Sequence, residues 1–177
     1  ATSAIIENCL FRGNNSYDTD AIDFDGITNG VIRENRIYNF FGDNSDGIDL
    51  GENSTNILIK NNLIFNCNDK GISVGQASTT NIENNIIVNC TQGVGVKDYS
   101  SFADITNSTF YKNDYAVASF EKNFGAGGGN IKVNNSILSS SIKGSYFLDQ
   151  LSELTISYSL SNIDKLPGVG NLYSDPN

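Results

Sequence analysis

Residues 59–74 read Ile59-Lys-Asn-Asn62-Leu-Ile64-Phe-Asn-Cys67-Asn-Asp-Lys70-Gly-Ile-Ser-Val74, and residues 82–96 repeat the pattern as Ile82-Glu-Asn-Asn85-Ile-Ile87-Val-Asn-Cys90-Thr-Gln92-Gly-Val-Gly-Val96. Each stretch has an apolar residue, an Asn three places later and an apolar residue two places beyond that. Self-similarity at a fixed period is the signature of repeat architectures, in which each repeat buries its apolar face against its neighbours. The repeat therefore decides the fold class.

The same motif continues in both directions along the chain. Its members are Ile5/Asn8/Leu10, Ile32/Asn35/Ile37, Ile59/Asn62/Ile64, Ile82/Asn85/Ile87, Ile105/Ser108/Phe110 and Val133/Ser136/Leu138. The spacings are 27, 27, 23, 23 and 28 residues, and the last one is long because of an insertion around Gly125-Ala-Gly-Gly-Gly129. A seventh, degenerate coil passes through Ile156.

A second short strand recurs with the same period: Asp20-Ala-Ile-Asp-Phe24, Asp46-Gly-Ile-Asp-Leu50, Lys70-Gly-Ile-Ser-Val74, Gln92-Gly-Val-Gly-Val96 and Tyr115-Ala-Val-Ala-Ser119. β-Branched runs separated by Asn, Gly, Asp and Ser are typical of strands and turns, and no segment has a sustained helical period. The sequence predicts an all-β parallel solenoid of about six to seven coils of roughly 22–29 residues. A leucine-rich repeat is the main alternative, but Ile rather than Leu dominates the repeat positions.

On the Asn-x-Ile motif and the recurrent Asp46-Gly-Ile-Asp49-like strand, the chain resembles the pectate-lyase-like right-handed parallel β-helix superfamily. The ending Leu166-Pro-Gly-Val-Gly-Asn-Leu-Tyr-Ser-Asp-Pro176 is similar to the last turn of such helices. The resemblance implies a right-handed β-helix and either a polysaccharide lyase or a carbohydrate-binding protein. Complete enzymes of the superfamily are longer. We therefore expect residues 1–177 to be a single domain excised from a larger protein and appended to other domains.

Composition restricts the function further. The net charge of −9 and the pI near 4.3 argue against nucleic acid as a partner, because phosphate binding depends on Lys and Arg. No apolar run is long enough to span a bilayer, so we expect no membrane partner. The chain has no His, which removes the commonest general base, and three Cys are too few for a disulfide framework. We expect an extracellular or cell-surface protein of a bacterium or archaeon.

The second strand also predicts a functional face. With Ile22, Ile48, Ile72, Val94 and their neighbours pointing inward, period-two alternation turns small residues outward. The first outward row is predicted to be Ala21, Gly47, Gly71, Gly93 and Ala116, forming a surface on which a ligand can lie. The walls of this groove are predicted to bind a polysaccharide through Asp20, Asp46, Gln92, Tyr99, Tyr115 and Phe120, together with Gly71 and Gly93.

Carboxylates gather at one end of this face. Asp23 and Asp49 are predicted to be stacked one coil apart, with Asp25 and Glu52 nearby. Like charges at such spacing repel, which either raises their pKa values or favours a hard cation with oxygen ligands. The sequence predicts a Ca²⁺ site formed by Asp23, Asp25, Asp49 and Glu52.

Three classes of function fit these features. The first is a carbohydrate-binding module that holds a plant or microbial polysaccharide in a shallow groove, with Ca²⁺ as a candidate cofactor. The second is a Ca²⁺-assisted lyase acting on uronate polymers, in which Lys70 or Lys97 is the catalytic base. A glycosidase using Asp23 and Asp49 is a variant of this enzyme class. The third is a structural or adhesive spacer whose small-residue face packs on another domain.

Overall fold

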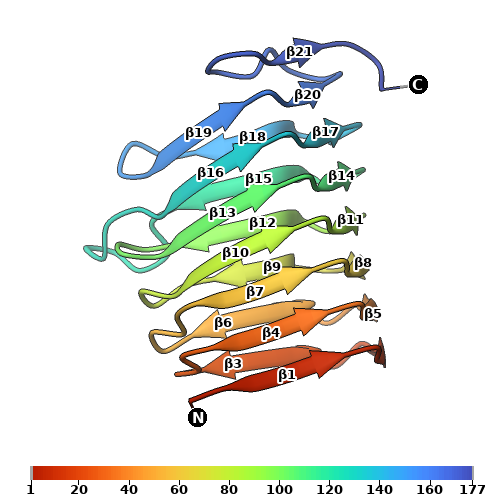
Figure 1. The fold of residues 1–177 in the computed structure, drawn as a ribbon, viewed down its shortest axis with the longest axis vertical. Helices are drawn as coiled ribbons and strands as arrows, with labels where there is room; N and C mark the ends of the chain where they lie inside the picture. Colours follow the sequence, from red (N-terminus) through yellow and green to blue (C-terminus); the bar gives the residue numbers. More distant parts are fainter. Residues whose placement is uncertain (1, 177) are drawn as a thin grey trace.

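The computed structural model describes residues 2–176, and in these residues the regular elements are strands, with no helix. The strands form three parallel sheets that wind into a solenoid of about seven turns (Figure 1). Sheet A contains β1 (Ala4–Glu7), β4 (Gly30–Arg33), β7 (Ile57–Lys60), β10 (Thr79–Glu83), β13 (Phe102–Thr106), β16 (Asn130–Asn134) and β19 (Glu153–Ser157).

Sheet B contains β2 (Leu10–Arg12), β5 (Arg36–Phe40), β8 (Leu63–Cys67), β11 (Ile86–Val88), β14 (Thr109–Tyr111), β17 (Ile137–Ser139), β20 (Leu160–Ser161) and β21 (Leu172–Tyr173). Sheet C contains β3 (Ile22–Asp25), β6 (Ile48–Gly51), β9 (Lys70–Val74), β12 (Gln92–Lys97), β15 (Tyr115–Phe120) and β18 (Gly144–Leu148). The predicted all-β parallel solenoid is confirmed. None of the described residues forms a helix that could cross a membrane.

Stacked aliphatic side chains form the core between the three sheets. Ile32, Ile59, Ile82 and Ile105 pair in consecutive strands of sheet A, and each is fully buried. The alternation of buried and exposed residues along these strands follows the period of two that a pleated strand imposes. The predicted repeat register is therefore confirmed for these four coils.

A ladder of buried side chains lies at the turn between sheets A and B. Asn62 Nδ2 donates to Asn85 Oδ1 at 3.0 Å and to the Ile32 carbonyl at 2.9 Å, while Asn35 donates both its backbone N–H and its Nδ2 to Asn62 Oδ1. Ser108 continues the ladder by accepting the Asn85 N–H. These bonds satisfy backbone groups in every coil they reach, which explains why the motif requires Asn or Ser at this position.

The first coil differs from its predicted register by one residue. Ile6, not Ile5, pairs with Ile32, and Ile5 is 65% exposed. Cys9 takes the ladder position predicted for Asn8, since its backbone N–H donates to Asn35 Oδ1 at 3.0 Å. The first coil is therefore one residue shorter than the motif alignment indicated, and Asn8 instead adopts a left-handed conformation with φ of 55°.

Candidate functional site

The outer face of sheet C carries the residues predicted to be functional. Asp23 pairs with Asp49, Asp49 with Ser73, and Ser73 with Gly95, so the middle outward row has the predicted register. The row continues through Ala118 to Phe147. Along the solenoid axis, this face changes from acidic at β3 and β6 to basic at β9 and β12, and then to aromatic at β15 and β18.

The predicted first outward row is wrong, because its glycines face the core. A Cβ on Gly71 would lie 2.5 Å from Ile87 Cγ2, and one on Gly93 would lie 2.6 Å from Phe110 Cδ1. Ala116 at the same position is fully buried. The alternation fails here because the chain turns from sheet B into sheet C, and both this residue and the next one point inward. Gly71 and Gly93 therefore cannot present a surface to a ligand.

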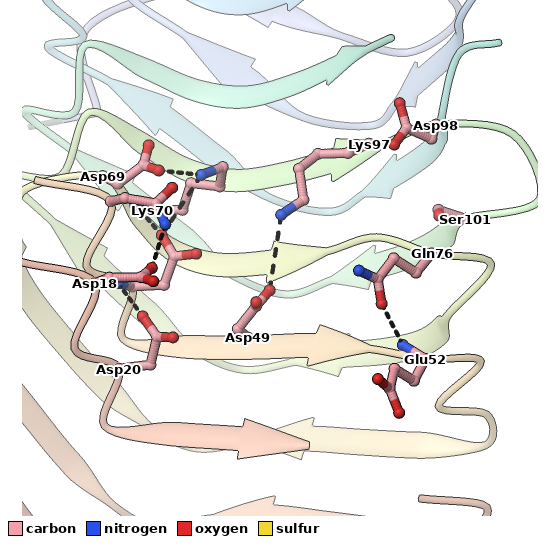
Figure 2. A network of polar contacts seen from close by, with 12 residues as sticks. Asp18, Asp20, Asp49, Glu52, Asp69, Lys70, Gln76, Lys97, Asp98 and Ser101 are labelled. Carbon is pink, nitrogen blue, oxygen red and sulfur yellow. Dashed lines mark hydrogen bonds and ion pairs between the residues drawn. The ribbon is translucent and has the colours of Figure 1, made fainter. Parts of the chain in front are cut away.

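Two lysine side chains lie over the glycines that do face outward. A Cβ on Gly95 would lie 2.8 Å from Lys70 Cδ, and a Cβ on Gly75 would lie 2.9 Å from Lys97 Cε. Gly75 and Gly95 thus leave room for the lysine chains themselves. Figure 2 shows both ammonium groups on this face, among carboxylates of neighbouring coils.

Lys70 is buried in a carboxylate cluster, with only 3% of its surface exposed. Its Nζ lies 3.6 Å from Asp46 Oδ1 and also contacts Asp69 Oδ2 (Figure 2). Burial opposes the charge of Lys70, but the Asp46 and Asp69 carboxylates outweigh it and raise the pKa of Lys70. A lysine that is held charged in this way is poorly suited to abstracting a proton. Asp69 was not among the predicted site residues, because it lies in the turn before the repeated strand.

For Lys97, burial and the neighbouring cations outweigh the effect of the nearby carboxylate on its pKa. Its Nζ lies 3.8 Å from Asp49 Oδ1, and that buried oxygen has no hydrogen-bond partner. Burial lowers the pKa of Lys97, the nearby Lys70 and Lys122 charges lower it further, and Asp49 only partly offsets them. Of the two predicted catalytic lysines, Lys97 is therefore the one whose neutral form is more accessible.

Two carboxylates at the acidic end of sheet C hold neighbouring coils together by hydrogen bonds. Asp20 Oδ1 accepts the backbone N–H of Asp46, and Asp46 Oδ1 accepts the backbone N–H of Lys70, each at 2.7 Å. Burial raises the pKa of Asp20, and it raises the pKa of Asp46 to about 7 despite the neighbouring Lys70. Burial, together with Asp25 and Asp49, also raises the pKa of Asp23 to about 6. The sequence correctly indicated crowded carboxylates but not their hydrogen bonds to the next coil.

The four predicted calcium ligands do not form a common coordination shell. Among residues 2–176, no three His, Cys, Asp or Glu side chains are grouped as a metal site. Asp49 lies beside the Lys97 ammonium, and Asp25 lies over Gly51, where a Cβ would contact its Oδ1. Calcium binding through Asp23, Asp25, Asp49 and Glu52 stays a prediction from sequence.

The aromatic end of sheet C holds a cavity of about 500 Å³. Tyr115, Tyr146, Phe147, Lys143 and Asp164 are among the residues that line it. The rings of Tyr115 and Phe147 lie 5.6 Å apart, and Phe120 approaches Phe147 edge-on at 6.3 Å. The structure therefore brings the predicted residues Tyr115 and Phe120 together. Phe147 was missed because the alignment of the second strand stopped one coil earlier.

Gln92 links the lysines to this aromatic end. It pairs with Lys70 on one side and with Tyr115 on the other. Its Oε1 lies over Gly95 and is buried without a hydrogen-bond partner. Tyr99, by contrast, is not part of this face: it is 76% exposed on the turn between sheets C and A and lines a different cavity. The turn after β12 carries it away from the other predicted ligand-binding residues.

A comparison with protein-family models agrees with this architecture. A search of curated proteins found no match. Among solved structures, the A-module of the mannuronan C-5 epimerase AlgE4 of Azotobacter vinelandii is similar, with 11% sequence identity and a TM-score of 0.49. The alignment covers 98% of this chain, which spans 58% of that module. The family model described as "Right handed beta helix region" matches residues 1–159. The chain therefore belongs to the right-handed β-helix family.

Proposed function

We propose that the chain binds a polysaccharide along the outer face of sheet C. The observation that carries the proposal is the cavity at the aromatic end, where Tyr115 and Phe147 border a concave surface of about 500 Å³. This volume lies within the range of roughly 300–1,000 Å³ typical of small-molecule sites. Aromatic rings pack on the apolar faces of sugar rings, and the adjoining Lys143 and Asp164 supply polar groups for their hydroxyls.

The remainder of the face extends the site along the solenoid axis. Gln92 is partly exposed and lies one strand from Tyr115, so its side chain borders the aromatic end. Lys70 is buried and fixed by two carboxylates, so it supports this part of the face from below. A linear ligand crossing these coils would meet the aromatic cavity first and then the Gln92 side chain.

Affinity electrophoresis on a panel of plant and algal polysaccharides tests the proposal. Wild type should be retarded in at least one gel. Tyr115→Ala and Phe147→Ala should each weaken retardation by roughly tenfold, the loss expected when an aromatic contact is removed. Tyr111→Ala is the matched control, because Tyr111 is 40% exposed on sheet B. No retardation of wild type by any polysaccharide, or equal effects of all three variants, would contradict the proposal.

A second candidate function, β-elimination on a uronate polymer, is favoured by Lys97. A neutral Lys97 amine would take the C5 proton, the C5–H electrons would form the C4=C5 double bond as the bond from C4 to the glycosidic oxygen breaks, and the departing oxygen would take a proton from water. Burial favours the neutral amine that this step requires. Incubation with pectate and alginate, with and without added Ca²⁺, should then raise the absorbance of unsaturated products. Lys97→Ala should abolish that rise without abolishing polysaccharide binding.

A further inference from the structure

The outer face of sheet A carries a second, separate concave surface. One depression of about 320 Å³ is lined by Asn56, Thr79, Thr80, Asn81 and Phe102. A second, of about 350 Å³, is lined by Tyr99, Ser100, Ser101, Phe102, Gly128, Gly129, Asn130, Leu151 and Glu153. The two depressions adjoin at Phe102, which lines both, and together we call them the sheet A groove.

The groove runs along the solenoid axis, because its lining residues come from consecutive coils. Thr79 pairs with Phe102, Phe102 with Asn130, and Asn130 with Glu153. At the parallel-strand spacing of roughly 4.8 Å, the five coils from Asn56 to Glu153 extend over about 19 Å. In Figure 1, sheet A faces the viewer, and its strands form a stack along the long axis of the solenoid.

The loop between β15 and β16 forms the wall of the groove at its C-terminal half, and hydrogen bonds hold this loop in place. Asp98 accepts hydrogen bonds from the Lys122 N–H at 2.7 Å, from the Asn123 N–H at 3.0 Å and from Asn123 Nδ2 at 2.6 Å. Glu121 Oε1 accepts the Gly127 N–H at 2.8 Å, which closes the loop on itself. The insertion that lengthens the repeat between β15 and β16 is therefore held in one position, where it projects beyond the neighbouring turns (Figure 1).

Glycines let this loop pack closely against the body. A Cβ on Gly129 would lie 2.6 Å from the Val96 carbonyl oxygen, and a Cβ on Gly128 would overlap Ser152 Oγ. Gly127 approaches Tyr99, whose Cβ would be 3.2 Å from an added Cβ there. The loop thus forms a side of the cavity and leaves the Tyr99 side chain 76% exposed beside it.

The chemistry of the lining selects the kind of ligand. Phe102, Tyr99 and Leu151 supply apolar surface, and between them Thr79, Asn81 and Asn130 supply hydroxyl and amide groups. Asn130 Nδ2 donates to Glu153 Oε2 at 2.6 Å, so this carboxylate is oriented at the groove.

The charges of this region disfavour an anionic ligand. Glu153 and Asp104 are acidic, and Lys132 on the same face already pairs with Asp104 at 3.6 Å. Acceptor oxygens next to aromatic rings suit a ligand with many hydroxyl donors and an apolar ring face. We propose that the sheet A groove binds a neutral oligosaccharide chain lying along the solenoid axis, at a site distinct from sheet C.

Native gels containing galactomannan, xyloglucan or mixed-linkage β-glucan test this proposal. Wild type should be retarded in at least one of them. Phe102→Ala should reduce that retardation about tenfold, because Phe102 borders both depressions. Tyr99→Ala and Leu151→Ala should reduce it as well, and these exposed positions keep the test valid if Phe102→Ala lowers the melting temperature. Tyr111→Ala on sheet B is the matched control, because this exposed ring lies in neither proposed site, and it should leave binding in that gel unchanged.

The outcomes separate this site from the one proposed on sheet C. If wild type is not retarded by any of the three neutral polysaccharides, or if all three groove variants bind as wild type does, the sheet A proposal is overturned. If Phe147→Ala abolishes binding while the groove variants bind as wild type does, the ligand lies on sheet C and the sheet A proposal is likewise overturned. Loss in the groove variants with Tyr111→Ala unchanged supports it, whatever Phe147→Ala does.

Discussion

Lys97 of β12 extends back across β9 and places its Nζ 3.8 Å from Asp49 Oδ1 of β6. Its path crosses Gly75, where any side chain would meet Lys97 Cε. The contact joins three consecutive coils on the outer face of sheet C. Asp49 Oδ1 makes no hydrogen bond, so the Lys97 ammonium is the cation that pairs with it.

Removing the Asp49 charge should lower the pKa of Lys97 further. Asp49 is the main group that offsets the burial of this lysine, so Asp49→Asn leaves desolvation and the neighbouring cations unopposed. Heteronuclear NMR titration of the lysine side chains measures the change. The control is Asp104→Asn, which lies on sheet A beside Lys132 and should leave Lys97 unaffected. An unchanged or higher Lys97 pKa in Asp49→Asn would be inconsistent with this geometry.

Two glycines of sheet C should respond differently to the same substitution. Gly93→Ala forces a methyl group against Phe110 and the Ala116 carbonyl in the core, and overpacking of this kind costs about 1–3 kcal/mol. Gly75→Ala meets only the flexible end of Lys97, so its cost should be within about 0.5 kcal/mol. Urea denaturation of the two variants checks the difference. Equal destabilisation would show that Gly93 does not face the core.

The Asn ladder should contribute more to stability than exposed Asn residues do. Asn62→Ala removes the partner of the Ile32 carbonyl and of the Asn35 N–H, and each buried group left unsatisfied costs about 1–3 kcal/mol. Asn81→Ala is the matched control, since Asn81 is exposed on sheet A. Thermal melts should show a large decrease for Asn62→Ala and little change for Asn81→Ala. Similar melting temperatures would mean that the ladder is not stabilising.

Stability should fall as pH rises from about 4 to 7.5. The folded-state pKa values of Asp23, at about 6, and Asp46, at about 7, lie above the usual value of 3.8. In that window the folded chain binds more protons than the unfolded chain does, so the free energy of unfolding decreases with pH. Asp23→Asn should reduce this decrease, and Glu34→Gln, at an exposed turn, should not. Melting temperatures that rise over the same range would contradict the raised pKa values.

Much of the fold was predictable because one register repeats. Stacked Ile and Asn positions require parallel strands. Because two motifs share one period, aligning one coil also aligns its neighbours. The first coil was misaligned because Cys9 replaces the ladder Asn, which shifted the match to Asn8 by one residue. The residues around Gly71 and Gly93 were misplaced because period-two alternation holds within a strand but not at the corner where the chain enters it.

The candidate site was only partly predictable, because the repeat specifies the register of the strands but not the turns or the insertion. Register brought together Lys70, Gln92 and Tyr115, which occupy equivalent positions in successive coils. The repeat gave no information on Asp69 or on the sheet A groove, since these depend on turns and on an insertion outside the motif. Nor could it show that lysine side chains, rather than a ligand, lie over the outward glycines.

Crystallography of the chain soaked with an oligosaccharide of whichever polysaccharide retards it in gels is the most direct test of binding on sheet C. The account predicts sugar density in the cavity beside Tyr115 and Phe147, extending toward Gln92. Density on other faces alone, with this cavity open to solvent in the crystal and free of sugar, would contradict it.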